Sequence, residues 1–205
     1  MVDLDLAIEL AEACAAVYAE KLAVGISKAS NGREIIAFRG TADLVDWIRD
    51  ANYPQVEFHG AKVHRGFLHD YQACAPLIKL RGRQPPYITG HSLGAAAAAL
   101  CAIDKDPEAT VITFGSPRVG DLDFLERYCT CGLQQRSWRI YNLQDVVPHL
   151  PPERIPDPFR LTIDHFEHVG MGFPLTFKGE GGGVFGPAHA ITNYIKALKN
   201  KRKVA

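Results

Sequence analysis

Residues 87–95 read Tyr87-Ile88-Thr89-Gly90-His91-Ser92-Leu93-Gly94-Ala95, and this stretch decides the fold. It combines a short apolar strand, a turn of the form Gly-x-Ser-x-Gly and the start of an alanine-rich helix. A nucleophile elbow requires this order, because a sharp strand-to-helix turn presents the serine hydroxyl at its apex. The two glycines lack Cβ atoms and allow the close approach. The same pattern also occurs in plain turns, but the flanking strand and helix favour an elbow with Ser92 as nucleophile.

Strands and helices alternate on both sides of this stretch, which predicts a mostly parallel sheet between two layers of helices. Together with the elbow, this pattern indicates an α/β-hydrolase fold, and we expect one domain spanning residues 1–205. Beyond the elbow helix, we expect helices over 4–21, 43–50, 64–80, 124–129 and 188–203. We expect strands over 22–28, 34–39, 55–58, 110–114 and 138–142, the third at a sheet edge, and two more within 159–178. The proline-rich stretch 148–158 is expected to be an ordered loop.

Composition excludes several classes of function. The 205 residues are 47% hydrophobic, which is enough for a sizeable core, and 23 basic residues balance 23 acidic ones. This neutral balance, with no recognisable motif, argues against a nucleic-acid partner. No apolar run approaches the length of a membrane span.

The N-terminal sequence and the cysteines bear on the cellular compartment. The acidic start lacks the basic segment and apolar core of a secretory signal, so we expect a cytoplasmic protein; the alternative is a secreted one whose signal has been removed. The five cysteines are odd in number and scattered, which does not suggest a disulfide framework. Their spacing does not fit a zinc site, and we expect neither metal nor cofactor.

A serine nucleophile needs a neutral imidazole and a carboxylate that orients it, and in these folds they follow in the order acid, then histidine. Asp145 directly follows a strand, where such an acid is expected, and Asp157 is the runner-up. His189 lies between a glycine-rich loop and the terminal helix, from which its ring could reach the serine.

The other histidines are weaker candidates for the base. His149 is close to Asp145 in sequence, while His165 and His168 fall in a strand pattern and are expected to be structural. His91 precedes the serine, but the elbow should turn its side chain away.

An oxyanion hole needs two donors aimed at the developing negative charge. The backbone N–H of Leu93, at the helix start, supplies one. Thr41, at the end of a strand, offers a backbone N–H and a hydroxyl for the other; its alternative role is an N-cap for the segment 43–50.

At this point the sequence resembles the class 3, fungal-type triacylglycerol lipases, a family that includes feruloyl esterases and plant phospholipases A1. The likeness covers about residues 34–195 and keeps the family's segment order. The matching segments are 38–41 (Phe-Arg-Gly-Thr), 46–50 (Asp-Trp-Ile-Arg-Asp), 63–67 (Val-His-Arg-Gly-Phe), 89–94 (Thr-Gly-His-Ser-Leu-Gly), 113–120 (Thr-Phe-Gly-Ser-Pro-Arg-Val-Gly), 145–148 (Asp-Val-Val-Pro) with 150–152 (Leu-Pro-Pro), and His189.

The resemblance implies the same roles as the residues themselves. Ser92 would be the nucleophile, Asp145 the acid and His189 the base, with Thr41 and Leu93 forming the oxyanion hole. We expect substrate contacts at four positions, Trp47, His91, Val147 and Leu150.

The segment 43–50 matches the position of the family's lid. It is short, and three aspartates face away from its apolar side, so we expect only modest activation at a lipid surface. Ala95 replaces a usual second glycine of the family, which adds one methyl group.

Two further sequence patterns resemble binding sites, and each has a simpler interpretation. The run 181–186 fits Gly-x-Gly-x-x-Gly, but no acidic residue follows at the spacing of a dinucleotide site, so we interpret it as a loop. The basic C-terminal segment is expected to be a solvated helix end; a transient contact with an anionic lipid surface is the alternative.

The sequence thus predicts a serine hydrolase that cleaves carboxylic esters without a cofactor, with lipid acyl esters as the substrates favoured by the resemblance. The alternatives are an esterase for small soluble esters, a feruloyl esterase, or a lipase-like module that no longer turns over. The sequence makes no prediction of oligomeric state.

Overall fold

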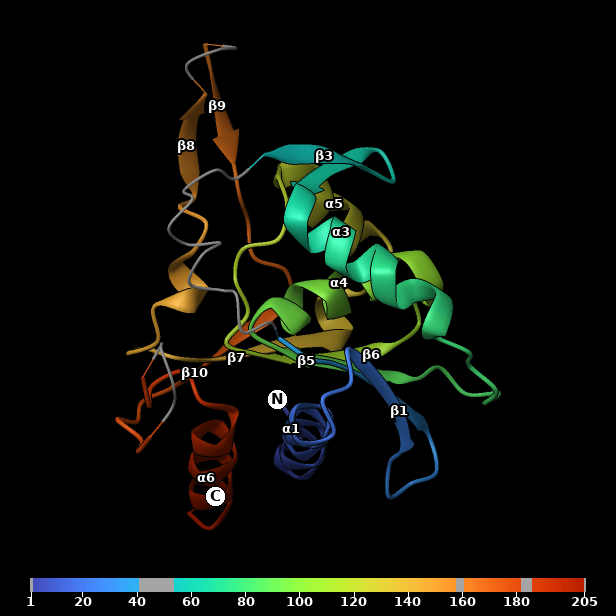
Figure 1. Ribbon diagram of the computed structural model, residues 1–205, viewed down its shortest axis with the longest axis vertical. Helices are drawn as coiled ribbons and strands as arrows, with labels where there is room; N and C mark the ends of the chain where they lie inside the picture. The colour runs from blue at the N-terminus through green and yellow to red at the C-terminus, as the bar shows by residue number, and fades with distance from the viewer. Residues whose placement is uncertain (1, 41–53, 158–160, 182–185, 205) are drawn as a thin grey trace.

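The computed structural model describes residues 2–40, 54–157, 161–181 and 186–204. Within them, a six-stranded sheet lies between two layers of helices, which confirms the α/β-hydrolase architecture (Figure 1). In spatial order, the strands are β1 (Val24–Lys28), β2 (Glu34–Phe38), β5 (Tyr87–His91), β6 (Thr110–Phe114), β7 (Ser137–Asn142) and β10 (Met171–Leu175). β1 runs antiparallel to β2, through a hairpin turn at residues 29–32, and the other neighbouring strands are parallel.

Helices α1 (Leu4–Ala19) and α6 (Ile191–Arg202) cover one face of the sheet and lie side by side below it in Figure 1. The side chain of Asp3 accepts hydrogen bonds from the N–H groups of Asp5 and Leu6 and so caps α1. The buried residues of α1 recur at helical spacing and pack with those of α6 into one core cluster.

Helices α3 (Arg65–Cys74), α4 (Leu93–Lys105) and α5 (Leu122–Thr130) lie on the opposite face (Figure 1). α4 is buried from Leu93 to Ile103, and its small alanines let it lie close to the sheet. The second core cluster forms between these helices and the strands.

A separate hairpin precedes α3. β3 (Gln55–Phe58) pairs with β4 (Ala61–His64) in a two-stranded sheet of its own, so it lies at a sheet edge, as the sequence predicts. The helix begins one residue later than expected, because His64 is in an extended conformation and its Nδ1 accepts from the N–H of Gly66 at 3.1 Å. α3 also ends at Cys74, and a short 3-10 turn, Ala75–Leu77, follows it rather than a helix reaching residue 80.

The proline-rich stretch is more structured than expected. It contains a 3-10 turn, Val147–His149, and strand β8 (Arg154–Asp157), which pairs with β9 (Thr162–His165) in a second hairpin. Pro156 is compatible with β8 because an isolated ribbon leaves one edge of each strand unpaired, where no backbone donor is needed. In Figure 1 this hairpin projects away from the central sheet.

β9 and β10 confirm the two strands expected within residues 159–178. The segment expected to form a helix over 43–50 lies outside the described residues, as does part of the glycine-rich loop. No helix in the described part of the chain is long and apolar enough to cross a membrane.

Candidate active site

Ser92 lies at a strained turn between β5 and α4. Its backbone angles are φ 60° and ψ −130°, a left-handed conformation that is rare for a residue with a side chain. The N–H of Ser92 donates to the carbonyl oxygen of Phe114 at 3.0 Å, so the turn is tied to the neighbouring strand. Strain of this kind persists only where the surrounding structure enforces it, and it is typical of functional positions.

The two glycines of the motif make the turn possible. A Cβ on Gly90 would clash with the carbonyl oxygen of Gly94, and a Cβ on Gly94 would lie 2.8 Å from the carbonyl carbons of Phe38 and Arg39. The strand, the helix and the end of β2 therefore approach too closely for any side chain at these positions. The elbow predicted from the sequence is present at Ser92.

The oxyanion elements lie beside this turn. Leu93 is the first residue of α4, so its N–H has no acceptor within the helix. Gly40, at the end of β2, packs against the elbow, and a Cβ added to it would lie 2.9 Å from that of Ser92. Thr41, the predicted second donor, is the next residue and lies outside the described residues. Its role stays a prediction.

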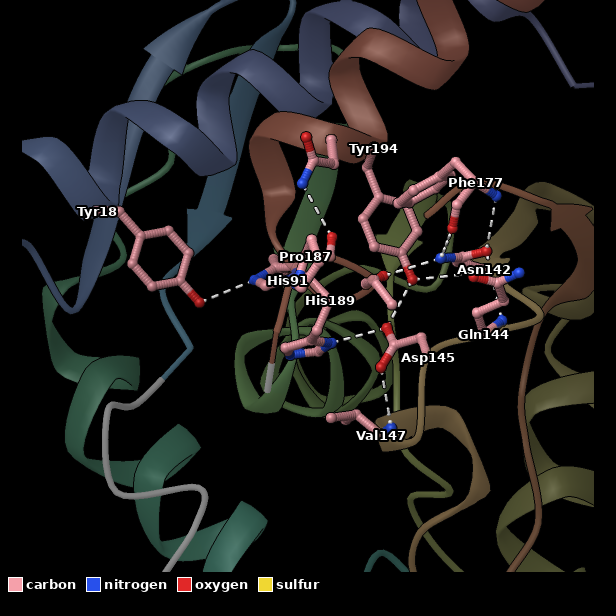
Figure 2. Close-up of polar contacts among 12 residues, drawn as sticks. Tyr18, His91, Asn142, Gln144, Asp145, Val147, Phe177, Pro187, His189 and Tyr194 are labelled. Carbon is pink, nitrogen blue, oxygen red and sulfur yellow. Dashed lines mark hydrogen bonds and ion pairs between the residues drawn. The ribbon is translucent and has the colours of Figure 1, made fainter. Parts of the chain in front are cut away.

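Asp145 and His189 are brought together although 44 residues separate them (Figure 2). Nδ1 of His189 lies 2.7 Å from Oδ2 of Asp145, and both residues are buried. Asp145 follows β7, while His189 precedes α6, as the sequence predicts. Such a pair fixes the orientation of the imidazole and directs its other nitrogen, Nε2, away from the acid.

Further donors surround the carboxylate of Asp145, which is 1% exposed. Oδ1 accepts from the N–H of Val147 at 3.0 Å, and Oδ2 accepts from the hydroxyl of Tyr194 at 2.7 Å. The Tyr194 hydroxyl itself accepts from the N–H of Asn142 at 3.0 Å (Figure 2). Burial, together with the adjacent Asp145, raises the pKa of Tyr194 well above its ordinary value, so the hydroxyl stays a donor.

Sequence reasoning missed Tyr194 and Asn142 as parts of the site. Tyr194 lies on the buried face of α6, five residues after His189, and its only signal in the sequence is an aromatic residue at a core position. Asn142 ends β7, and its side chain bonds Phe177 and the carbonyl oxygen of Ala188, which anchors the loops around His189.

Two of the residues expected to contact substrate, His91 and Val147, are buried in the structure. His91 is 4% exposed and both its ring nitrogens have partners, Tyr18 and the carbonyl oxygen of His189, so its ring has no polar group left to bind a substrate. Val147 is fully buried in the core and acts on Asp145 through its backbone. Both residues thus have structural roles, and their expected substrate contacts stay predictions.

Leu150 is half-buried, and its role stays a prediction. Trp47 lies outside the described residues. Leu143 and Val146, which flank Asp145, are more than half exposed and were not singled out from the sequence.

The alternative acid and bases do not join the pair. Asp157 ends β8 in the hairpin that projects from the sheet, remote from β7 in the topology. His149 is exposed, and His165 lies in β9, as the sequence predicts. His168 is mostly buried, and burial with Arg139 and Arg118 nearby lowers its pKa to about 3. Among the residues that the structure describes, no three His, Cys, Asp or Glu side chains are placed to share a metal ion.

A strained serine between strand and helix, together with a buried carboxylate–imidazole pair from the loops after β7 and before α6, defines an α/β-hydrolase with a site of the Ser-His-Asp type. The sequence comparison agrees with this class. A family model described as lipase (class 3) matches residues 35–155, and the chain belongs to that family.

Its relatives include enzymes of two kinds. A lipase of Rhizomucor miehei is 37% identical over 136 residues, which span 57% of this chain and 37% of that lipase. Phospholipase A1-II 6 of Oryza sativa subsp. japonica is 33% identical over 173 residues, 61% of this chain and 42% of the relative. The chain thus covers less than half the length of both curated relatives.

Solved structures share the fold. A deletion mutant of the Rhizomucor miehei lipase, in complex with its propeptide, superposes with a TM-score of 0.61 at 25% identity, over 83% of this chain and 64% of that one. A triacylglycerol lipase whose catalytic centre is a serine protease triad superposes with a TM-score of 0.60 at 25% identity, over 84% of this chain and 78% of its own.

Proposed function

We propose that this protein hydrolyses carboxylic esters of lipids through an acyl-enzyme formed on Ser92. The observation that carries the proposal is the buried 2.7 Å contact between Nδ1 of His189 and Oδ2 of Asp145, in a fold that holds Ser92 at a strained elbow. Family membership supports the same reaction, since related proteins are named as lipases and phospholipases A1.

The residues divide the chemistry as follows. Nε2 of His189 accepts the proton of the Ser92 hydroxyl as Oγ attacks the ester carbonyl, and Asp145 stabilises the imidazolium that forms. The carbonyl oxygen becomes an anion, to which the N–H of Leu93 donates; a donor of this kind contributes about 100- to 1,000-fold in rate. His189 then protonates the leaving alcohol, the ester C–O bond breaks, and the acyl group stays on Ser92. Water, deprotonated by His189, releases the acid.

The Ser92 hydroxyl makes no hydrogen bond with any residue in the described part of the chain. This fits a nucleophile whose bond to its base tightens once a substrate is bound.

The test is hydrolysis of soluble p-nitrophenyl esters with mass-spectrometric detection of an organophosphonate adduct. Wild-type protein should turn over and carry the adduct on Ser92. Ser92→Ala should lose nearly all activity and the adduct, with its far-UV circular dichroism unchanged. Asp145→Asn should lose about 10⁴-fold in kcat, because the imidazole then has the wrong tautomer. Activity that survives in Ser92→Ala would overturn the assignment.

The relatives leave two lipid classes open, neutral acylglycerols and phospholipids. Release of fatty acid from dispersed tributyrin and from phosphatidylcholine vesicles, measured in parallel with Ser92→Ala as the blank, separates them.

A further inference from the structure

His91 connects two elements that lie far apart in the sequence. Its Nδ1 lies 2.9 Å from the hydroxyl of Tyr18 on α1, and its Nε2 lies 2.7 Å from the carbonyl oxygen of His189 (Figure 2). The ring therefore bridges helix α1 and the backbone of the base. It also packs against the ring of His189, with centroids 4.5 Å apart.

The partners leave one consistent proton arrangement. A carbonyl oxygen only accepts, so Nε2 of His91 must carry a hydrogen. Burial is the main cause that lowers the pKa of His91 well below its ordinary value, with His189 adding to it, so the ring is neutral and Nδ1 is an acceptor. Burial raises the pKa of Tyr18, so its hydroxyl is the donor to Nδ1.

His91 contacts three titratable residues: Tyr18 on α1, Tyr194 on α6, and His189, which precedes α6. Cys14 and Arg39 act on Tyr18 rather than on His91. The tyrosines and the cysteine are neutral, because burial raises the pKa of each above its ordinary value. His91 thus adds no positive charge beside His189 at the moment when that ring becomes an imidazolium.

The backbone of His189 needs this anchor. His189 lies between β10 and α6, and the hydrogen bond from its N–H to Gly186 is long, at 3.4 Å. Asp145 holds the ring at Nδ1, while His91 holds the backbone carbonyl of the same residue, so one anchor acts on the side chain and the other on the backbone. Tyr18 also packs against Gly40, the residue before the predicted oxyanion donor Thr41.

We propose that Tyr18 and His91 are positioning residues of the reaction. The hydroxyl of Tyr18 donates to His91, and His91 donates to the backbone carbonyl of His189. These two bonds keep the His189 ring in place for its hydrogen bond to Asp145. This inference rests on the proposed function, since the reaction that His189 serves is the ester hydrolysis argued above. It assigns to the histidine beside the nucleophile a role that involves no contact with substrate.

The first test compares kcat and KM for a soluble p-nitrophenyl ester. His91→Leu removes the donor to the carbonyl of His189. We expect kcat to fall at least about 30-fold and KM to stay within about threefold of the wild-type value. The loss appears in kcat because an unpaired buried group and a displaced base both act on the transition state. His91→Gln can still donate through its amide and should recover at least half of that loss on a logarithmic scale. Tyr18→Phe should lower kcat about 3- to 10-fold.

Two variants serve as matched controls. Tyr128→Phe removes a buried hydroxyl that makes a 2.9 Å bond to Ser137, and His69→Gln changes an exposed histidine. Both should keep kcat within about twofold. If His91→Leu also stayed within threefold of wild type, or if His91→Gln lost as much as His91→Leu, the positioning role would be refuted.

The second test does not depend on activity. Imidazole ¹⁵N–¹H correlation spectra of uniformly labelled wild-type protein should show His91 as the neutral Nε2–H tautomer from pH 5 to 9. Tyr18→Phe should add a fraction of the Nδ1–H tautomer. A His91 that titrates within this range, or that is Nδ1–H in the wild type, overturns the inference. A wild type without esterase activity would refute the proposed function instead, while these spectra still decide the proton arrangement.

Discussion

Gly115→Ala should damage the reaction through the Asp145–His189 pair alone. Gly115 follows β6 with φ +56°, and a Cβ built on it would lie 3.0 Å from Oδ2 of Asp145 and 3.2 Å from Nδ1 of His189. These are the two atoms that form the 2.7 Å contact. A methyl group there must push the pair aside by a few tenths of an ångström.

The magnitude follows from the displacement. A misplacement of about 1 Å can cost about 100-fold in rate, so a shift of a few tenths corresponds to about a 3- to 10-fold loss in kcat. Alanine in a left-handed conformation also costs about 1–2 kcal/mol of stability, or about 2–8 °C in Tm for a chain of this size. The two effects need separation.

Gly60→Ala separates them. Gly60 has φ +80°, and a Cβ there would meet nothing within 4 Å, so this variant carries the backbone strain without a contact at the site. Initial rates with a soluble p-nitrophenyl ester and calorimetric Tm values for both variants should show similar losses of stability and a loss of kcat in Gly115→Ala only. Equal kcat values in the two variants would refute the reasoning.

Three more predictions follow from other parts of the molecule. Tyr194→Phe should lower kcat about tenfold and the free energy of unfolding by about 1–3 kcal/mol, because Asp145 loses a donor and a buried N–H loses its acceptor. The control is Tyr71→Phe, which removes a 2.5 Å hydrogen bond to Asp104 and should lower stability but not kcat. Equal kcat losses in the two variants would contradict this prediction. The unfolded chain protonates His168 near pH 6.5, while the folded chain does so near 3. The free energy of unfolding should therefore fall by about 1.4 kcal/mol for each pH unit between about pH 6 and about pH 3. His168→Gln should reduce this slope by that amount when the free energy of unfolding is measured with urea at each pH, and an unchanged slope would contradict the prediction. From the sequence of the segment 43–50, initial rates against tributyrin should rise only modestly at saturation, and less still in Trp47→Ala, whereas a steep jump there would show a strong interfacial lid.

The parts predicted correctly from the sequence depend on local patterns. The elbow needs two glycines at fixed offsets from Ser92, and Asp145 and His189 each follow a recognisable strand or precede a recognisable helix. Chain order in this fold then restricts which residues can meet. Strands β4 and β8 were not predicted from the sequence. Each belongs to a short two-stranded sheet, whose formation depends on the partner strand more than on the intrinsic β-propensity of its residues.

The polar contacts beneath the site could not be predicted in the same way. Tyr18 and Tyr194 belong to α1 and α6, and in the sequence they are aromatic residues on buried helix faces, with no sign that their hydroxyls bond His91 and Asp145. These contacts depend on how the helices dock on the sheet. Tertiary placement, rather than periodicity, turns a core tyrosine into a donor.

The buried carboxylate of Asp145 shows why the layer of α1 and α6 matters for chemistry. A carboxylate removed from water is costly unless its oxygens accept hydrogen bonds. Asp145 receives one from the backbone of Val147, one from Tyr194 on α6 and one from His189, so its charge is held by three separate segments. On the other side, Tyr18 on α1 holds His91, which holds the backbone of His189. One helix of this layer therefore restrains the acid and the other restrains the base, and a change that loosens their docking should reach the reaction before it unfolds the protein.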